Sequence, residues 1–90
     1  MAIVVKFSVS GMSTDKYEAA LRQLQTADAG APPGRLYHVS YGSRDSLQVI
    51  DVFDSQKSLE DFGKTLGPIL DKLGIKTQPE VAEAYKIIKG

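Results

Sequence analysis

The amino-acid sequence predicts a single α+β domain over residues 1–90, in which a four-stranded antiparallel sheet carries two helices on one face. One observation behind this prediction is the order of its segments, whose spacing of apolar residues follows β-α-β-β-α-β. A second is that the strands expected at the centre of the sheet, residues 3–10 and 47–53, are apolar at both alternating positions. Because two helices can cover only one face, the other face is predicted to pack against a second copy.

The first predicted strand, residues 3–10, is rich in β-branched and aromatic side chains. Ser13 or Thr14 then caps a helix, with Asp15 favourably placed in its first turn. This helix presents one apolar stripe, formed by Tyr17, Ala20, Leu21, Leu24 and Ala27. Gly30 is predicted to take the left-handed conformation that stops the helix, because the Ala-Pro-Pro-Gly segment that follows cannot continue it.

A β-hairpin is predicted next. Residues 36–41 and 47–53 have strand composition, and the residues between them, 42–46, are typical of a turn. A last strand is predicted over residues 81–88. Right-handed crossovers turn the whole order into a ferredoxin-like sheet, with the first and third strands central and both helices on the same face.

The second helix is predicted between the hairpin and the last strand, with Ser55 or Ser58 as its cap. Its stripe is the clearest amphipathic pattern in the chain and consists of Leu59, Phe62, Leu66, Ile69, Leu70 and Leu73. Pro68 inside it predicts either a kink or a fresh helical turn. Gly74 fits the position just beyond the helix, and Ile75 can fold back as its hydrophobic cap.

Composition argues against several functions. Eleven basic and eleven acidic side chains cancel and are scattered, without the basic stripe of a nucleic-acid-binding protein. The N-terminus is unlike a signal peptide and no stretch approaches the roughly 20 apolar residues of a membrane span, so we expect a cytoplasmic protein that binds no membrane. The absence of cysteine excludes thiolate chemistry. Without a glycine-rich phosphate loop, and with one histidine, we expect no cofactor and no metal, unless a dimer shares a His-carboxylate site.

Two polar residues interrupt the predicted hairpin. His38 is the only histidine, and Asp51 is a carboxylate within the apolar segment Val-Ile-Asp-Val-Phe. A charge at such a position must be paired, hydrogen-bonded or lining a wet cavity. Whether the two side chains meet depends on the hairpin register. A two- or four-residue loop places His38 opposite Asp51, whereas a three- or five-residue loop places them on opposite faces.

Sorting the side chains by polarity favours the register that pairs them. It gathers an apolar face of Tyr37, Val39, Tyr41, Ile50 and Val52. The other face then holds His38, Ser40 and Asp51 beside Val49 and Phe53, and Lys6 and Ser8 could join it. A His–Asp pair would fix the tautomer of the histidine, as a general base requires. The structural alternative is that His38 is a satisfied sheet residue, with Asp51 held by Tyr37, Tyr41 or a lysine of a partner subunit.

The chain resembles the dimeric α/β-barrel superfamily. The resemblance rests on the short βαββαβ layout, on Ala-Pro-Pro-Gly-Arg-Leu-Tyr-His-Val from Ala31, and on Leu-Gln-Val-Ile-Asp-Val-Phe-Asp-Ser from Leu47, which runs into a helix with Phe62 and Pro68. Within that superfamily the chain is similar to small bacterial proteins related to antibiotic biosynthesis monooxygenases. The third strand of such proteins commonly ends in Trp-Glu-Ser, where this chain has Phe-Asp-Ser.

The resemblance implies a homodimer whose two sheets pack face to face, with a pocket between sheet and helices in each subunit. Characterised members include cofactor-independent oxygenases of aromatic polyketides, haem-degrading enzymes and small-molecule isomerases. Their activities reside in pocket residues, which a fold does not carry over. This chain lacks the tryptophan typical of several oxygenase pockets and any helix-borne histidine for haem, and both absences weigh against an enzyme.

Two hypotheses follow. The first is a homodimeric small-molecule-binding protein, a monooxygenase-like enzyme acting on an aromatic or quinol-like substrate. His38 and Asp51 are then its candidate catalytic residues, and its candidate ligand-binding residues are Tyr37, Tyr41 and Phe53. The second is a non-catalytic dimeric binding or structural module, associated with stress or with a pathway, in which His38 and Asp51 satisfy each other or the dimer interface.

Overall fold

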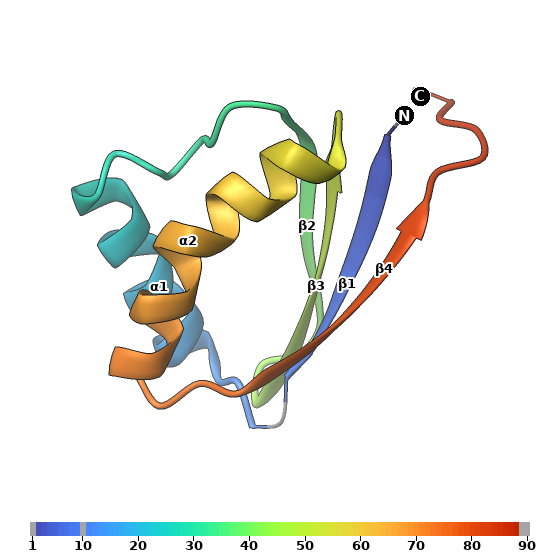
Figure 1. Ribbon diagram of the computed structural model, residues 1–90. Helices are drawn as coiled ribbons and strands as arrows, with labels where there is room; N and C mark the ends of the chain where they lie inside the picture. Colours follow the sequence, from blue (N-terminus) through green and yellow to red (C-terminus); the bar gives the residue numbers. More distant parts are fainter. Residues whose placement is uncertain (1, 10, 89–90) are drawn as a thin grey trace.

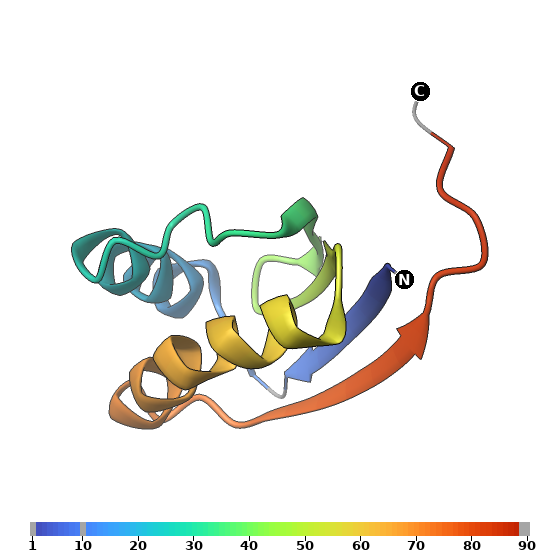
Figure 2. The same ribbon diagram turned by 45° about the horizontal axis from the view of Figure 1, so that its top comes forward.

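The computed structural model describes residues 2–9 and 11–88, and its elements follow the predicted βαββαβ order. The strands are β1 (Ile3–Val9), β2 (Arg35–Ser43), β3 (Ser46–Phe53) and β4 (Thr77–Glu83), and the helices are α1 (Thr14–Thr26) and α2 (Gln56–Lys72). The sheet is antiparallel in the order β2-β3-β1-β4, so the first and third strands are central, as predicted. Both helices cover the same face of the sheet (Figures 1 and 2), which confirms the ferredoxin-like α+β fold.

The hairpin between β2 and β3 closes on a two-residue turn. Ser43 pairs with Ser46, which leaves only Arg44 and Asp45 between the strands. A two-residue loop is one of the two loop lengths that were predicted to place His38 opposite Asp51, and the structure pairs these two residues. The register slips once, near the start of β2 between Arg35 and Tyr37. Both strands extend slightly beyond the predicted ranges, because the pairing continues up to the turn.

Helix α1 begins as predicted but ends differently. The Ser13 side chain accepts a hydrogen bond from the Lys16 backbone N–H, 3.3 Å away, and so caps the first turn. At the other end the left-handed residue is Asp28, with φ of 58°, rather than Gly30. The Ala29 N–H bonds to the Leu24 carbonyl oxygen at 2.7 Å and closes the helix. The prediction of Gly30 was wrong because aspartate tolerates this conformation and Ala29 can then pack on the core.

Helix α2 is capped by Ser55, whose hydroxyl accepts from the Ser58 N–H at 3.2 Å, so the first of the two predicted caps is the one used. The helix continues through Pro68 to its last turn. Gly74 is left-handed, with φ of 69°, and the buried Ile75 donates its backbone N–H to the Leu70 carbonyl oxygen at 2.9 Å. The predicted helix stop is therefore confirmed, down to its hydrophobic cap.

The last strand lies earlier in the sequence than predicted. β4 covers Thr77–Glu83, so the prediction of residues 81–88 was wrong over most of its range. The observed strand contains Pro79, a residue type that the interior of a sheet excludes. Because β4 pairs only with β1, it is an edge strand, and an edge position tolerates a proline that donates no ladder hydrogen bond. The predicted end of the first strand at Ser10 lies outside the described residues.

The core lies between the sheet and the two helices. Val5 and Phe53 are fully buried, and Phe53 packs against Phe62 of α2 with ring centroids 5.7 Å apart. One core cluster consists of Ile3, Val5, Leu24, Phe53 and Phe62, and the second consists of Val9, Met12, Ala20, Val49 and Ile75. Alternation along β1 and β3 directs these strand residues inward, since successive side chains point to opposite faces.

The opposite face of the sheet carries no helix and is largely apolar. It presents Val4 of β1, Tyr37, Val39 and Tyr41 of β2, and Ile50 and Val52 of β3. Val39 is 52% exposed. Lys6 and Ser8 also lie on this face, because Lys6 pairs with Ile50. The suggestion that they join His38 and Asp51 was therefore wrong.

Ala84 follows β4 and still donates its backbone N–H to the Ala2 carbonyl oxygen at 2.9 Å. The chain then continues beyond the end of the sheet with residues 85–88 (Figures 1 and 2). Tyr85 is almost entirely exposed and Ile88 is 80% exposed. A broad hollow separates this segment from Val4, Tyr37 and Val52 on the open face of the sheet. In the described part of the chain, no helix is long and apolar enough to cross a membrane.

Candidate functional site

The hairpin brings His38 and Asp51 together on the helix-covered face of the sheet. The His38 Nδ1 atom lies 2.5 Å from the Asp51 Oδ1 atom. Asp51 is 2% exposed and is the only charged residue among the buried side chains that the structure describes. A carboxylate removed from water in this way requires a donor, and the His38 ring supplies it.

Tyr17 of α1 completes a chain of three side chains. Its hydroxyl lies 2.8 Å from the other ring nitrogen of His38, Nε2. The planes of the two rings differ by 8° and their centroids are 6.2 Å apart. The hydrogen bond joins an atom in one ring plane to an atom in the other, so the two nearly parallel planes are at most about 2.8 Å apart. Most of the 6.2 Å between the centroids is therefore a sideways offset, and the rings lie side by side rather than face to face.

One proton arrangement satisfies all three groups. A carboxylate can only accept, so the His38 Nδ1–H donates to Asp51. The Nε2 atom of the neutral ring then carries a lone pair and accepts the Tyr17 hydroxyl proton. Asp51 thus sets the tautomer of His38 and directs its basic nitrogen away from the sheet, towards the helices. This is the orientation that a general base needs.

The three side chains line a cavity between the sheet and the helices. The volume of this cavity is about 60 Å³, and its wall is mainly apolar. The aliphatic and aromatic part of the wall includes Phe7, Val9, Met12, Leu21, Leu24, Phe62, Leu66, Leu70 and Ile75. An apolar cavity with a few convergent polar groups is the usual form of a small-molecule site.

Asp51 has a second carboxylate oxygen available. Its Oδ1 atom accepts from His38, whereas no hydrogen bond from the described residues reaches Oδ2. Since Asp51 lines the cavity, this oxygen can accept a bond from a hydroxyl or N–H group inside it.

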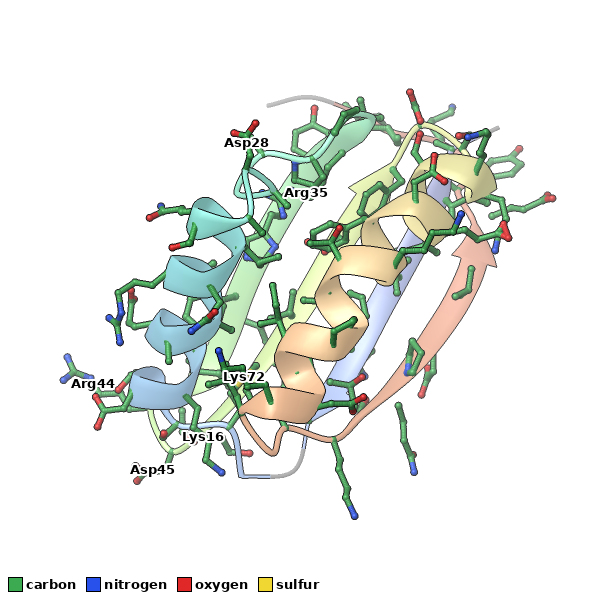
Figure 3. The ribbon with its side chains drawn as sticks, turned by 60° about the vertical axis from the view of Figure 1, so that its left-hand side comes forward. Lys16, Asp28, Arg35, Arg44, Asp45 and Lys72 are labelled. Carbon is green, nitrogen blue, oxygen red and sulfur yellow. The ribbon has the colours of Figure 1, made fainter. Side chains whose placement is uncertain are left out.

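Arg35 adds a positive charge to the cavity wall. Its Nη2 atom donates to the Gly30 carbonyl oxygen at 2.9 Å, and its guanidinium carbon lies 5.8 Å from the centroid of the Phe62 ring. Figure 3 shows Arg35 near Asp28, at the end of the helix layer where α1 finishes. The other labelled charges, Lys16, Arg44, Asp45 and Lys72, lie at the opposite end. Arg35 is thus held in place at one end of the site.

The remaining sequence candidates do not lie in this cavity. Tyr37 and Tyr41 are on the open face of the sheet, because their positions alternate with His38 along β2. Phe53 is on the helix-covered face, but it is fully buried in the core and is not part of the cavity wall. The structure therefore does not bring these three side chains to the wall of the His38–Asp51 cavity.

Sequence reasoning missed the role of Tyr17, which it assigned to the apolar stripe of the first helix. The available signal was chemical. A buried tyrosine needs a partner for its hydroxyl, and the other members of that stripe are alanine and leucine. A helix that crosses over β2 brings its stripe close to the middle of that strand. A tyrosine in the first turn of such a helix is thus a candidate partner for His38.

No group of three histidine, aspartate or glutamate side chains lies close enough to hold a metal ion within residues 2–9 and 11–88. The possible metal-binding groups on the cavity wall are one imidazole, one carboxylate, one phenol and the hydroxyl of Thr77.

No protein-family model matches this sequence, and no curated protein matches it either. Solved structures do match. SnoaB, a cofactor-independent oxygenase from Streptomyces nogalater, superposes with a TM-score of 0.62 at 17% identity, over 99% of this chain and 96% of its own. A protein from Caulobacter crescentus CB15, named as a candidate antibiotic biosynthesis monooxygenase, gives a TM-score of 0.66 at 15% identity, over 94% and 91% of the two chains.

These matches confirm the predicted resemblance at the level of the fold: the chain has the ferredoxin-like fold of antibiotic biosynthesis monooxygenases. A de novo designed protein, Foldit4, matches as well, with a TM-score of 0.64 at 9% identity over 93% of this chain and 99% of its own. A fold that natural and designed sequences share cannot assign an activity, which must be argued from the site.

Proposed function

We propose that this protein is a cofactor-independent enzyme that binds a small aromatic molecule between its sheet and helices and removes a proton from a hydroxyl group of that molecule. The observation that supports this most directly is the Asp51–His38 pair, which lines an apolar cavity and has its second ring nitrogen bonded to the Tyr17 hydroxyl. An oriented imidazole in such a place is suited to general base catalysis. The apolar wall suits the ring of the substrate, and the second oxygen of Asp51 suits a further hydroxyl.

A monooxygenase reaction is the chemistry that we favour, since SnoaB has this fold and is a cofactor-independent oxygenase. His38 takes the hydroxyl proton of a phenol, and the resulting phenolate is rich enough in electrons to react with dioxygen. One oxygen atom enters the ring and the other leaves as water, so that a phenol and dioxygen give a quinone and water. The substrate supplies all four electrons, and no external reductant is needed.

We further propose that two copies pack through their open sheet faces. Val39, Tyr37 and Tyr41 expose large apolar surfaces there, and the neighbouring Val4, Ile50 and Val52 extend them across the two central strands. Contiguous apolar surfaces of this kind mark interaction sites. The catalytic residues lie on the other face, so each subunit would keep its own cavity.

A non-catalytic role is the second candidate, and the size of the cavity favours it. At about 60 Å³ the space is smaller than the engineered cavity of about 150 Å³ that holds benzene. Asp51, His38 and Tyr17 also satisfy one another. On this alternative the three residues form a structural network, and their replacement alters stability alone.

Oxygen uptake with a panel of phenols, naphthols and hydroquinones separates the two candidates. His38→Asn is the decisive variant, because the asparagine amide can still donate to Asp51 while the basic Nε2 atom is lost. We expect the wild type to turn over at least one panel member and His38→Asn to lower kcat at least about 100-fold.

Ser40→Ala is the matched control, since Ser40 lies on the same strand and the same face but not in the cavity wall. It should leave turnover unchanged. Equal turnover by His38→Asn and Ser40→Ala, or no turnover by the wild type with any panel member, would count against the proposal. Mass spectrometry with labelled dioxygen should find one labelled oxygen atom in the product.

A further inference from the structure

We infer that the Tyr17 side chain occupies the subsite of the substrate ring, so that the ligand is a phenol which replaces Tyr17 on His38. This inference rests on the proposed function, because it takes His38 as the residue that binds the substrate hydroxyl. It adds the place of the substrate ring, which is the position that the Tyr17 ring now holds, and the change of conformation that admits it.

The hydrogen bond between Tyr17 and His38 is the first reason. In the closed structure the lone pair of Nε2 is already used, 2.8 Å from the Tyr17 hydroxyl. A general base can act on a substrate only when the substrate hydroxyl is within hydrogen-bond reach of this nitrogen. Tyr17 and a substrate therefore compete for one atom, and Tyr17 must leave before a substrate can bind.

The volume of the cavity is the second reason. About 60 Å³ is too little for an aromatic ring, whereas the Tyr17 ring already lies beside the cavity and forms part of its wall. If that ring swings out, the space it vacates has the shape of a phenol and is continuous with the apolar wall formed by Leu21, Leu24 and Leu66.

The position of Tyr17 in the chain makes such a movement feasible. The residue lies in the first turn of α1 and is only half-buried, so solvent is within reach of its side chain. Its hydroxyl bonds to His38 alone among the described residues. Release costs this hydrogen bond, with a net strength of about 0.5–1.5 kcal/mol, which corresponds to a factor of about 2–10 in an equilibrium constant. It also removes the packing of the Tyr17 ring against the second core cluster, and the ring of a bound phenol would replace that packing.

Binding of p-cresol, which is the tyrosine side chain without its backbone, tests the inference. Toluene has nearly the same shape but no hydroxyl and serves as the matched ligand. Affinities are measured by NMR titration for the wild type, Tyr17→Ala, Tyr17→Phe and the double variant Tyr17→Ala with His38→Asn. We expect Tyr17→Ala to bind p-cresol about 3–10-fold more tightly than toluene, and the double variant to lose that preference.

Tyr17→Phe keeps the ring and removes the bond that holds it, so it decides the matter if Tyr17→Ala does not fold. It should bind p-cresol about 2–10-fold more tightly than the wild type. Addition of p-cresol to the wild type should shift the ring signals of Tyr17 and the Nε2 signal of His38. Equal affinities of Tyr17→Ala for the two ligands, or weaker p-cresol binding by Tyr17→Phe than by the wild type, would overturn the inference.

The oxygen-uptake assay keeps the two proposals distinguishable. If Tyr17→Phe loses turnover together with His38→Asn, Tyr17 is a positioning residue: the proposed function stands and the displacement of Tyr17 is refuted. If no variant and no panel member gives turnover but p-cresol displaces Tyr17 as described, the subsite stands and the catalytic proposal fails.

Discussion

The two faces of the sheet use the same strands in opposite ways. On the helix-covered face, Asp51 is enclosed by an apolar core and bonded to the half-buried His38. On the open face, apolar residues such as Val39 are exposed, and β1 adds only Lys6 and Ser8 as polar neighbours. Burial therefore does not follow polarity here. A polar pair that contains a buried carboxylate and an uncovered apolar surface are both departures from the usual distribution, and such departures are candidates for functional and interaction sites.

The largest effect is expected at His38. His38→Leu leaves the Asp51 carboxylate buried without its donor and should lower the free energy of unfolding by about 3 kcal/mol, somewhat less than for a fully enclosed pair because the His38 side chain is 24% exposed. The double variant His38→Leu with Asp51→Leu removes the unpaired charge and should recover much of the loss. Urea denaturation measures the free energy of unfolding of the wild type, His38→Leu and the double variant. A double variant less stable than His38→Leu would mean that the pair itself stabilises the fold.

Val5 and Val4 are neighbouring valines on opposite faces of β1, so the same substitution at each compares the contributions of the two faces to stability. Val5→Ala removes two methyl groups from a fully buried position and should lower the free energy of unfolding by about 2 kcal/mol. Val4→Ala makes the same change on the open face and should cost less than about 1 kcal/mol at protein concentrations where the chain is a monomer. Equal losses in dilute solution would show that the open face is covered within one chain.

Val39 tests what covers the open face. Val39→Lys places a charge within the apolar surface of the proposed sheet-to-sheet contact and should raise the dissociation constant of the dimer at least about tenfold. Sedimentation at several concentrations provides the measurement. Ser40→Lys, one residue along the same strand and on the opposite face, is the control and should leave self-association unchanged. A wild type that sediments as a monomer at every concentration would contradict the proposed dimer.

The smallest effect is expected on the outer surface of α2, where Lys57 and Asp61 form an exposed ion pair with a 2.8 Å contact. The hydrogen bond from Lys57 lowers the pKa of Asp61 below 3.8, and the bond to Asp61 raises the pKa of Lys57 above 10.5. The stabilisation from Asp61 is thus present above its unfolded pKa and is lost as the pH falls through its folded pKa. The stabilisation from Lys57 is present below its unfolded pKa and is lost as the pH rises through its folded pKa.

Asp61→Asn should therefore lower the free energy of unfolding slightly, and only at pH values between the folded-state pKa of Asp61 and the folded-state pKa of Lys57. The difference from the wild type should shrink in high salt, because exposed pairs are screened. Thermal denaturation across pH provides the measurement, with Asp71→Asn on the same helix as a control for the removal of one negative charge. A loss that is as large at pH 2 as at pH 7 would contradict this account.

The sequence predicted the local features whose causes are local. The Gly74 stop and its Ile75 cap depend on neighbouring backbone and were predicted correctly, and so was the amphipathic stripe of α2. Prediction failed where the outcome depends on the position of a segment in the sheet. The last strand was predicted too late in the sequence, and the observed β4 contains Pro79, which only its edge position allows. The prediction of a left-handed Gly30 was also wrong, because the chain takes that conformation two residues earlier, at Asp28.

By itself the sequence determined the βαββαβ order, the central position of β1 and β3, and a preference, from the sorting of polar and apolar side chains, for the register that pairs His38 with Asp51, because apolar periodicity and turn chemistry are properties of neighbouring residues. The tertiary structure fixed that register, through the two-residue turn at Arg44 and Asp45. It alone brought Tyr17 to the Nε2 atom of His38, since 21 residues separate the two and no short-range pattern links them. A contact between a helix and a strand depends on how the layers pack, and that packing is decided by the whole core at once.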